Sequence, residues 1–404
     1  MDKNYLLNES KYFCIFPWIH QYVSPKGDVL PCCSTDNSSC LGSTKTHSLE
    51  QVFNNENTKE MRRLMLEDKP HDLCRSCYKF EESHPYSYRN FARSRFGHLI
   101  DIIDTTLIDG TVPEFKLRYI DVRFSNLCNF KCRTCGSECS SQFAAEQRQL
   151  GIDGEVLLRA DGRNGQLLQE VLTQIDNAEM IYFAGGEPLI ADEHYEIIEE
   201  LIRRNRTDIK LRYNTNCSNL NYKNYDLAKL WSHFDNVEIS CSIDHYGERA
   251  EYIRKGTVWS EVEHNIRIIR EMPNVDLQFN TVLSVFNYTT IHNFYDYMIK
   301  NDLIRETDFH HFICTTSNPM HYSATSLPNN IKEAATQDIK RYIDNMNGFD
   351  KVKQLLLMSI EFANQNDTWE ENKIEFNKET KQRDRLRNES FTVLFPELAE
   401  MIIE

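Results

Sequence analysis

The sequence predicts an α/β fold, because strand-like and helix-like segments alternate from about residue 117 to 315. Apolar runs of strand length recur six times, at Arg118–Ser125, Met180–Ala184, Ile209–Asn214, Val237–Asp244, Val275–Leu283 and Asp308–Ile313. Helical patterns lie between them, at Tyr195–Asn205, Tyr225–His233, Ser260–Met272 and Ile291–Lys300. This order predicts a parallel sheet with right-handed crossovers. Six units are too few to close a standard eight-stranded barrel.

Length and composition predict more than one structural unit. The chain has 404 residues, of which 40% are hydrophobic and 26% are charged, enough for a sizeable core. We expect a small cysteine-rich module over residues 1–110, the strand-helix units over 111–320, and a helical extension over 321–404 that packs on them. The extension is crowded with Lys, Asp and Glu, which is typical of helices that face solvent.

Charge and hydrophobicity argue against two kinds of partner. The formal net charge of -15 argues against general nucleic-acid binding, which depends on clustered Lys and Arg. No run approaches the ~18 apolar residues of a membrane span, and the N-terminus lacks a signal-peptide pattern, so we expect a cytoplasmic protein. In that reducing compartment, the 13 cysteines are better explained by metal ligation than by disulfides.

Three cysteines lie in one short loop directly after the first predicted strand. This cysteine triplet consists of Cys128, Cys132 and Cys135, separated by three and by two residues. Three thiolates hold three irons of a four-iron cube and leave the fourth iron for a ligand from outside the protein. The spacing therefore indicates chemistry at a cluster. A structural zinc knuckle is the alternative, and Cys139 would offer it a fourth ligand.

Glycine-rich and polar positions follow the other predicted strands. The turn from Gly185 to Pro188 comes after the second strand, Asn214 ends the third and Asp244 ends the fourth. The carboxyl ends of parallel strands meet at one edge of a barrel, where active sites are built. We therefore expect these residues to converge with the cysteine triplet on one ligand.

The loop from Arg123 to Gly136 and the Gly-Gly-Glu-Pro turn together resemble the radical S-adenosylmethionine (SAM) enzymes. The resemblance implies a partial (β/α)6 TIM-like barrel, a 4Fe-4S cluster held by the cysteine triplet, and SAM bound to the free iron. Reductive cleavage of SAM then yields methionine and a 5'-deoxyadenosyl radical, which takes a hydrogen atom from the substrate. One position departs from the family, because Thr134 stands where an aromatic residue usually helps to seat the adenine.

The resemblance also implies SAM contacts beyond the triplet. Gly185 and Gly186 let the backbone come close to the methionine amino group. Ser242 approaches the ribose or the carboxylate of SAM, and the planar guanidinium of Arg254 pairs with the carboxylate. The expected cofactor-binding residues are Phe130, Gly185, Gly186, Glu187, Asn214, Ser242, Asp244 and Arg254.

The segment before the barrel resembles the SPASM or twitch module over the runs 13–18, 27–33, 41–42 and 73–77. In that module an auxiliary 4Fe-4S cluster has a complete set of thiolates, which implies ligation here by Cys14, Cys32, Cys74 and Cys77. Cys33 is an alternative to Cys32, and an all-thiolate zinc site is an alternative to the cluster. The module usually follows the barrel, whereas here it precedes it.

Candidates for catalytic residues lie near the third and sixth predicted strands. His310, His311 and Cys314 surround the sixth strand, where a histidine would move a proton and a thiol would donate a hydrogen atom. Tyr213 and Asn214 near the third strand are further candidates for the substrate-facing shell. Each also fits a structural role, because alternate strand residues face the core.

These features favour a radical SAM enzyme with an auxiliary cluster that modifies a peptide or protein side chain. An electron donor such as flavodoxin or ferredoxin is the expected partner. Radical oxidation or epimerisation of a sugar, an aminoglycoside-like molecule or a nucleotide is the alternative. A non-catalytic zinc-binding interaction protein is the third hypothesis, and it predicts that no 5'-deoxyadenosine forms from SAM.

Overall fold

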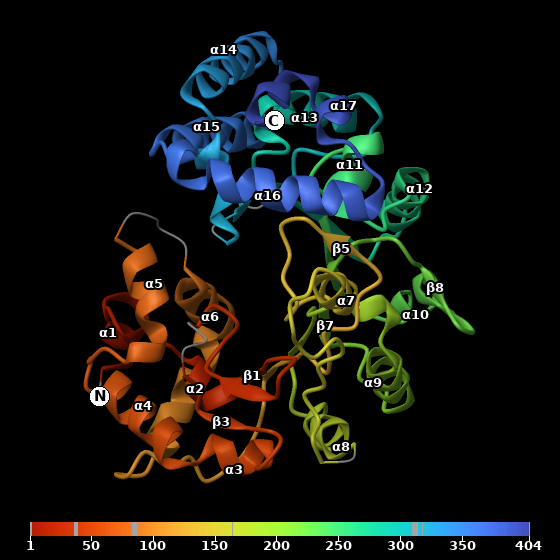
Figure 1. Ribbon diagram of the computed structural model, residues 1–404. Helices are drawn as coiled ribbons and strands as arrows, with labels where there is room; N and C mark the ends of the chain where they lie inside the picture. The colour runs from red at the N-terminus through yellow and green to blue at the C-terminus, as the bar shows by residue number, and fades with distance from the viewer. Residues whose placement is uncertain are drawn as a thin grey trace.

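The computed structural model describes residues 2–35, 39–82, 87–163, 165–308, 314–316 and 318–403. Figure 1 shows a small N-terminal module of short helices and strands beside a central α/β part. A group of C-terminal helices covers one end of the central part.

The central feature is one eight-stranded sheet with the order β12-β10-β7-β6-β4-β1-β2-β3. Its five barrel strands pair in parallel with one another, which confirms the predicted α/β arrangement. These strands are β4 (Tyr119–Val122), β6 (Met180–Phe183), β7 (Lys210–Thr215), β10 (Val237–Ser242) and β12 (Val275–Asn280). Buried and less buried residues alternate along β7, so its two faces meet different surroundings.

The N-terminal module adds three strands to the same sheet. β1 (His20–Val23) pairs in parallel with β4, so that Val23 lies opposite Val122. β2 (Asp28–Leu30) and β3 (Gly42–Ser43) continue the sheet in antiparallel orientation. The module and the barrel therefore share one hydrogen-bonded sheet, an arrangement that the sequence did not predict.

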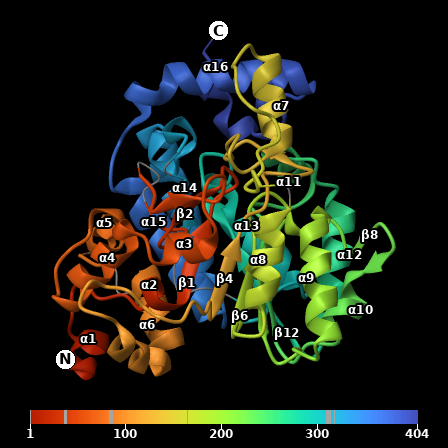
Figure 2. The ribbon, with the colours of Figure 1, turned by 90° about the horizontal axis from the view of Figure 1, so that it is seen from below.

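Helices pack along the parallel strands, and Figure 2 shows several of them side by side. α9, for example, turns an apolar stripe of Ile197, Ile198 and Leu201 into the core. The helices of this central part are α7 (Ser141–Gln149), α8 (Gln166–Gln174), α9 (Asp192–Arg203), α10 (Leu227–Trp231), α11 (Gly247–Ile253), α12 (Trp259–Arg270) and α13 (Ile291–Lys300). The bounds of α13 agree with the prediction.

In the described residues, three short strand pairs lie outside the large sheet. They are β5 (Lys131–Cys132) with β11 (Arg254–Lys255), β8 (Asn221–Tyr222) with β9 (Tyr225–Asp226), and β13 (Val282–Leu283) with β14 (Cys314–Thr315). The predicted sixth strand falls mostly outside the described residues, but its first residue, Asp308, accepts a hydrogen bond from the Phe279 backbone of β12. The chain therefore runs beside the edge of the sheet there.

Short helices make up most of the N-terminal module. They are α1 (Lys3–Asn8), α2 (Phe16–Ile19), α3 (Leu49–Phe53), α4 (Glu56–Leu66), α5 (Arg75–Phe80) and α6 (Tyr88–Phe96), with 3-10 turns at Asp72–Cys74 and Gly97–Thr105. Ser48 and Gln51 start α3 with a capping box. Arg62 of α4 is fully buried and donates to the carbonyls of Pro17 and Gly110, which ties the module together.

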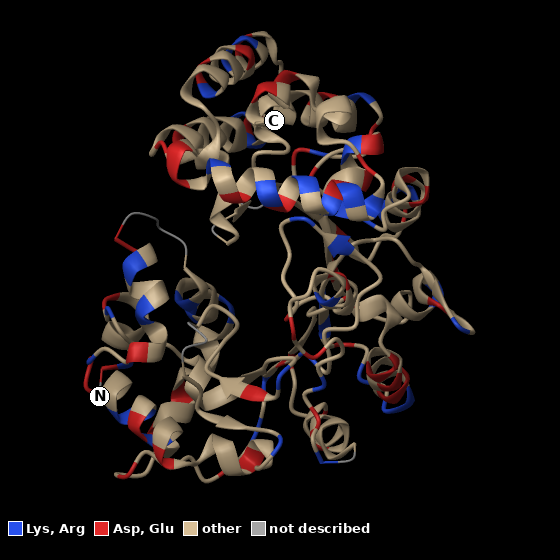
Figure 3. Cartoon of the chain, viewed as in Figure 1, with Lys and Arg blue, Asp and Glu red and all other residues tan. Residues whose placement is uncertain are grey.

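The C-terminal helices are α14 (Asn329–Asn345), α15 (Asp350–Asn364), α16 (Trp369–Arg387) and α17 (Phe391–Leu394), followed by a 3-10 turn at Pro396–Met401. α16 lies above the β5 loop in Figure 1 and next to α7 in Figure 2, in agreement with its ion pairs to Glu146 of α7. Its surface is crowded with both signs of charge (Figure 3). The prediction of a solvated helix is wrong on one side of α16, because Arg383 and Arg387 are buried against Glu146 of α7.

The expectation that the cysteines avoid disulfides is wrong at one place. Cys217, which follows β7, is bonded to Cys241 of β10, and both residues are fully buried. The end of β7 pairs with β10, which brings the loop at Cys217 close to Cys241. The other eleven cysteines are free thiols, among them all seven predicted cluster ligands.

Within the described part of the chain, no helix has both the length and the apolar composition of a membrane span.

Candidate functional site

The cysteine loop and the Gly-Gly-Glu-Pro turn are in direct backbone contact. The Glu187 N–H donates to the Leu127 carbonyl at 2.7 Å. A Cβ at Gly186 would lie 2.0 Å from that carbonyl oxygen, so only glycine allows the contact. Gly185 has a φ of +121°, which also favours glycine. The chain itself therefore needs both glycines, whatever they contribute to a ligand.

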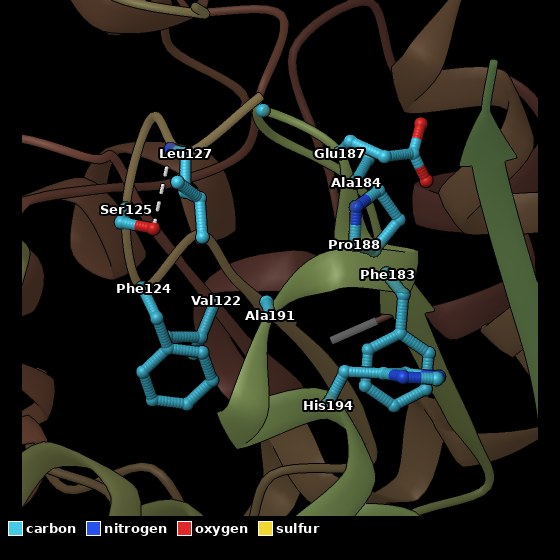
Figure 4. Close-up of a pocket in the computed structure, with 11 residues that line it drawn as sticks. Val122, Phe124, Ser125, Leu127, Phe183, Ala184, Glu187, Pro188, Ala191 and His194 are labelled. Carbon is cyan, nitrogen blue, oxygen red and sulfur yellow. Dashed lines mark hydrogen bonds between the residues drawn. The ribbon is translucent and has the colours of Figure 1, made fainter. Parts of the chain in front are cut away.

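The Glu187 side chain braces the ends of two neighbouring strands. Its carboxylate accepts hydrogen bonds from the Leu189 N–H (3.0 Å), the Thr215 hydroxyl (2.7 Å) and the Asn216 N–H (2.8 Å). In Figure 4 it points away from Phe124 and Leu127. Burial raises the pKa of Glu187 to about 7, although the three donors favour the ionised form. In this structure the residue connects β6 to β7.

The Glu187→Gln variant is expected to lose about 1–3 kcal/mol of unfolding free energy, because an amide N–H would face hydrogen-bond donors. The wild type should also become less stable as the pH rises from about 4.5 to about 7, since folding raises the carboxyl pKa across that window. The variant should lack this slope. Urea unfolding across the window measures both effects, and an equal slope in the two proteins would contradict the assignment.

The β5–β11 pairing places Arg254 directly opposite Cys132. The Arg254 Nε donates to Asp244 Oδ2 at 2.8 Å, and Nη1 lies 3.9 Å from Cys132 Sγ. Asp244 is held in turn by the Val282 N–H at 2.8 Å. Although burial opposes the charged guanidinium, Asp244 and the nearby thiols raise the pKa of Arg254. A fixed positive charge therefore lies beside the cysteine triplet.

The three thiols of the triplet lie close to one another. Burial raises the pKa of Cys128 to about 12, and Cys132 adds to this effect. Burial likewise raises the pKa of Cys135, with contributions from both other thiols. Such thiols stay protonated at neutral pH unless a metal takes the place of the proton, which suits a cluster. Among the described residues, no three His, Cys, Asp or Glu side chains are grouped as a single-ion site.

The other predicted SAM contacts divide into two groups. Asn214 and Ser242 are half-buried near the carboxyl ends of β7 and β10, in the positions expected for a ligand at this edge. Phe130 is buried beneath β11, where Gly256 has a φ of +116° and a Cβ there would lie 2.7 Å from the Phe130 ring. Phe130 therefore packs the cysteine loop against β11.

The structure corrects one catalytic candidate and leaves the others as predictions. Tyr213 is fully buried on the face of β7 that meets α9, where its hydroxyl lies 2.9 Å from His194 Nε2 and its ring stacks on Phe183. It cannot face a substrate, because strand residues alternate and Asn214 takes the opposite side. His310 and His311 lie outside the described residues.

Cys314 lies in β14 and is half-buried opposite Val282. Burial raises the pKa of its thiol to about 11, and the nearby Asp244 adds to this effect. The residue is therefore a protonated thiol at neutral pH, near the carboxylate that holds Arg254.

Four cysteines line one pocket in the N-terminal module: Cys14, Cys32, Cys74 and Cys77. Burial raises the pKa of Cys74 to about 12, and the Cys77 thiol adds to it. Arg89 lines the same pocket and donates to the Ser10 and Phe13 carbonyls, which holds the segment before Cys14. These residues come from three separate segments, as a four-thiolate site requires.

Cys33 lies apart from that pocket. Its side chain is exposed, and the charged groups near its thiol are Asp121, Arg123 and Arg212 of the barrel. Cys32 is instead surrounded by the other pocket thiols. The geometry therefore favours Cys32 over Cys33 as the fourth ligand of the module.

Comparison with known families agrees with this geometry. Residues 14–78 match an iron-sulfur cluster-binding domain, SPASM, and residues 122–298 match the radical SAM superfamily. The fold and the two cysteine groups thus define an iron-sulfur protein, with a radical SAM domain over residues 122–298 and a SPASM domain over residues 14–78. The SPASM domain precedes the barrel, as predicted. The two families imply a SAM-binding 4Fe-4S cluster and an auxiliary cluster, so iron is favoured over the zinc alternatives.

Solved structures that this chain matches in part include native anSMEcpe with bound AdoMet and Cp18Cys peptide. It is 19% identical, with 55% of this chain and 57% of that chain covered and a TM-score of 0.38. Streptococcus suis SuiB bound to S-adenosylmethionine is 14% identical, with 80% and 69% covered and a TM-score of 0.37. The chain therefore spans little more than half the length of the first structure. The search of curated proteins finds no match.

Proposed function

We propose that this protein is a radical SAM enzyme that modifies a peptide or protein side chain. The observation that carries the proposal is the cysteine triplet, gathered at the carboxyl edge of the sheet beside a buried arginine, with four further thiols around a separate pocket. When bound, the first cluster would supply the electron that cleaves SAM to the hydrogen-abstracting 5'-deoxyadenosyl radical. The peptide substrate is the type that the resemblance to SPASM proteins implies.

The residues of this chain have separable tasks in the proposal. Cys128, Cys132 and Cys135 would each bind one iron and leave the fourth iron for SAM. Arg254, held by Asp244, would pair with the carboxylate of SAM through its planar guanidinium. Asn214 and Ser242 would add polar contacts from β7 and β10.

The N-terminal module would hold the second cluster. Cys14, Cys32, Cys74 and Cys77 form a full set of four thiolates, so this cluster would have no vacant iron. It is therefore suited to carry an electron and not to bind SAM. An external donor such as flavodoxin or ferredoxin would supply the reducing electron.

Anaerobic reconstitution tests the proposal. The wild type should take up about eight irons per chain, and the Cys74→Ala/Cys77→Ala variant about four. Cys40→Ala is the control, because Cys40 lines neither site and should leave the iron content unchanged. With dithionite and SAM, the wild type should form 5'-deoxyadenosine. A wild type that binds zinc only, or that forms no 5'-deoxyadenosine, would disprove the proposal.

A further inference from the structure

A cavity of about 620 Å³ separates the N-terminal module from the barrel strands. One wall is formed by α5 and α6 of the module, with the aromatic rings of Phe80, Tyr88 and Phe91. The opposite wall is formed by the charged side chains of Lys210 and Arg212 on β7 and of Glu238 on β10, together with Met180 of β6. The volume lies within the range of small-molecule and side-chain binding sites.

The charged wall carries more positive than negative charge. The single carboxylate of Glu238 lies 2.7 Å from both Lys210 Nζ and Arg212 Nε. All three side chains are at least 84% buried, since their exposed fractions are 15%, 16% and 12%. The next carboxylate on this face, Asp276, is exposed and lies one strand further away, opposite Glu238. Among the described residues that line the cavity, the buried cations therefore exceed the buried anions by one, and buried charge requires a counter-charge.

The neighbouring barrel arginine does not change this balance. Arg123 is already matched by Asp121, whose Oδ1 lies 2.5 Å from Arg123 Nε. Arg95, which also lines the cavity, adds a further exposed positive charge. This local excess contrasts with the net charge of -15 for the whole chain.

Arg212 is positioned so that only its N–H edge remains for a ligand. Its guanidinium carbon lies 5.1 Å from the ring centroid of Tyr182 and 5.1 Å from that of Phe91, so aromatic rings contact the guanidinium. Within the described part of the chain, the buried Arg212 Nε forms no hydrogen bond, although Glu238 lies at ion-pair distance. A guanidinium held in this way binds an oxyanion in its own plane.

The cavity also lies close to the edge of the sheet where SAM is proposed to bind. Arg212 precedes Asn214 by two residues on the same face of β7. At about 3.3 Å per residue, their backbones are about 7 Å apart. A molecule anchored on Arg212 would therefore extend its neighbouring atoms toward the edge where the cysteine triplet lies.

We propose that this cavity binds the substrate through a carboxylate or phosphate group paired with Lys210 and Arg212. The apolar part of the substrate packs on Phe80, Tyr88 and Phe91. The proposal rests on the proposed function and adds the chemical class of its substrate. In the sequence, Lys210 and Arg212 stand at alternate positions of a predicted strand, and this pattern could have indicated the site.

Equilibrium dialysis of the reconstituted full chain tests the anion preference. The probes are three pools of synthetic hexapeptides in which a fixed phenylalanine is followed by glutamate, phosphoserine or glutamine. An anionic pool should be retained about tenfold more than the glutamine pool, as expected for a charge-assisted pair. Either anionic pool supports the site, and their ratio identifies the anion. Equal retention of all three pools would overturn the inference.

Three variants make the test specific. Lys210→Gln should reduce the anion preference by about tenfold. The matched Lys229→Gln variant, on the exposed side of α10, should leave it unchanged. Glu238→Gln should increase it, because the competing carboxylate is removed. A misfolded variant would lose binding to every pool, so the opposite responses of Lys210→Gln and Glu238→Gln cannot arise from misfolding. Equal behaviour of Lys210→Gln and Lys229→Gln would overturn the inference.

Formation of 5'-deoxyadenosine without any peptide tests the proposed function alone. If SAM is cleaved but the dialysis shows no anion preference, only the substrate class fails. If SAM is not cleaved, the proposed function fails regardless of the dialysis.

Discussion

Replacement of Cys132 by Ala is expected to lower the formation of 5'-deoxyadenosine by more than about 100-fold, since even indirect partners of metal ligands typically cost 10–100-fold. The remaining two thiols of the triplet would bind two irons of a four-iron cube, which is too few to hold it. Cys132 also lies directly opposite Arg254, so its loss separates the cluster from the residue proposed to bind SAM. Anaerobic turnover with dithionite and SAM, followed by chromatography, measures the effect.

Cys139→Ala is the matched control for this loss. Cys139 lies in the same loop region, four residues after Cys135, but is exposed. It should keep wild-type product formation and wild-type iron content. A Cys132→Ala protein with wild-type turnover would contradict the assignment of the triplet.

Replacement of Glu146 by Gln is expected to cost about 3–5 kcal/mol of unfolding free energy, because it removes the counter-charge of the buried Arg387, whereas Arg383 keeps its pair with Glu379. Glu146 is fully buried, and its carboxylate accepts hydrogen bonds from Arg383 at 2.6 Å and from Arg387 at 2.8 Å. Arg387 also donates to the Lys131 carbonyl, next to Cys132. In the variant, both α16 and the cysteine loop should therefore be less firmly packed.

Urea unfolding followed by tryptophan fluorescence measures this loss, and Trp369 at the start of α16 reports on the same helix. Glu375→Gln is the matched control, because Glu375 forms an exposed pair with Lys378 on α16 and should cost less than about 1 kcal/mol. Similar losses in both variants would contradict the role of the buried cluster.

We also expect the stability of the wild type and of the Glu146→Gln variant to depend differently on pH. Although burial opposes its charge, Arg387 and Lys131 lower the pKa of Glu146 to about 2. Its contribution to stability is therefore complete above the usual pKa of 4.5 and is lost as the pH falls toward about 2. The Glu146→Gln variant should show a smaller loss of stability over that acid range.

The sequence predicted local features of the fold better than long-range ones. The pattern that predicted Ile291–Lys300 as a helix depends on neighbouring residues, and α13 has those bounds. The parallel pairing of β1 with β4 depends on two short strands far apart in the chain. No pattern within His20–Val23 identifies its partner, because many strands have the same alternation.

The candidate site shows the same division. The spacing of the cysteine triplet is local, and the family comparison supports it. The role of Glu187 as a brace between β6 and β7 depends on donors from Thr215 and Asn216, which the turn motif does not contain. Whether Tyr213 faces a substrate or the core stayed open, because the alternation of a strand does not by itself say which face meets the helices, and the structure places it in the core.

Charge composition also did not predict that one side of α16 is buried. A helix rich in charged residues is usually solvated, but Arg383 and Arg387 find a buried partner in Glu146, more than two hundred positions earlier in the chain. Such a pairing follows from the tertiary packing alone. The proposed role of the cysteine loop depends on this pairing, because Arg387 of α16 also donates to the Lys131 carbonyl of that loop.

The most direct test is electron paramagnetic resonance of the anaerobic, reduced protein with and without SAM. The Cys74→Ala/Cys77→Ala variant isolates the signal of the triplet from that of the N-terminal module. We expect a 4Fe-4S signal whose g-values shift when SAM is added, because SAM binds the iron that carries no thiolate. A triplet without a cluster, or a cluster signal that SAM leaves unchanged, would contradict the account.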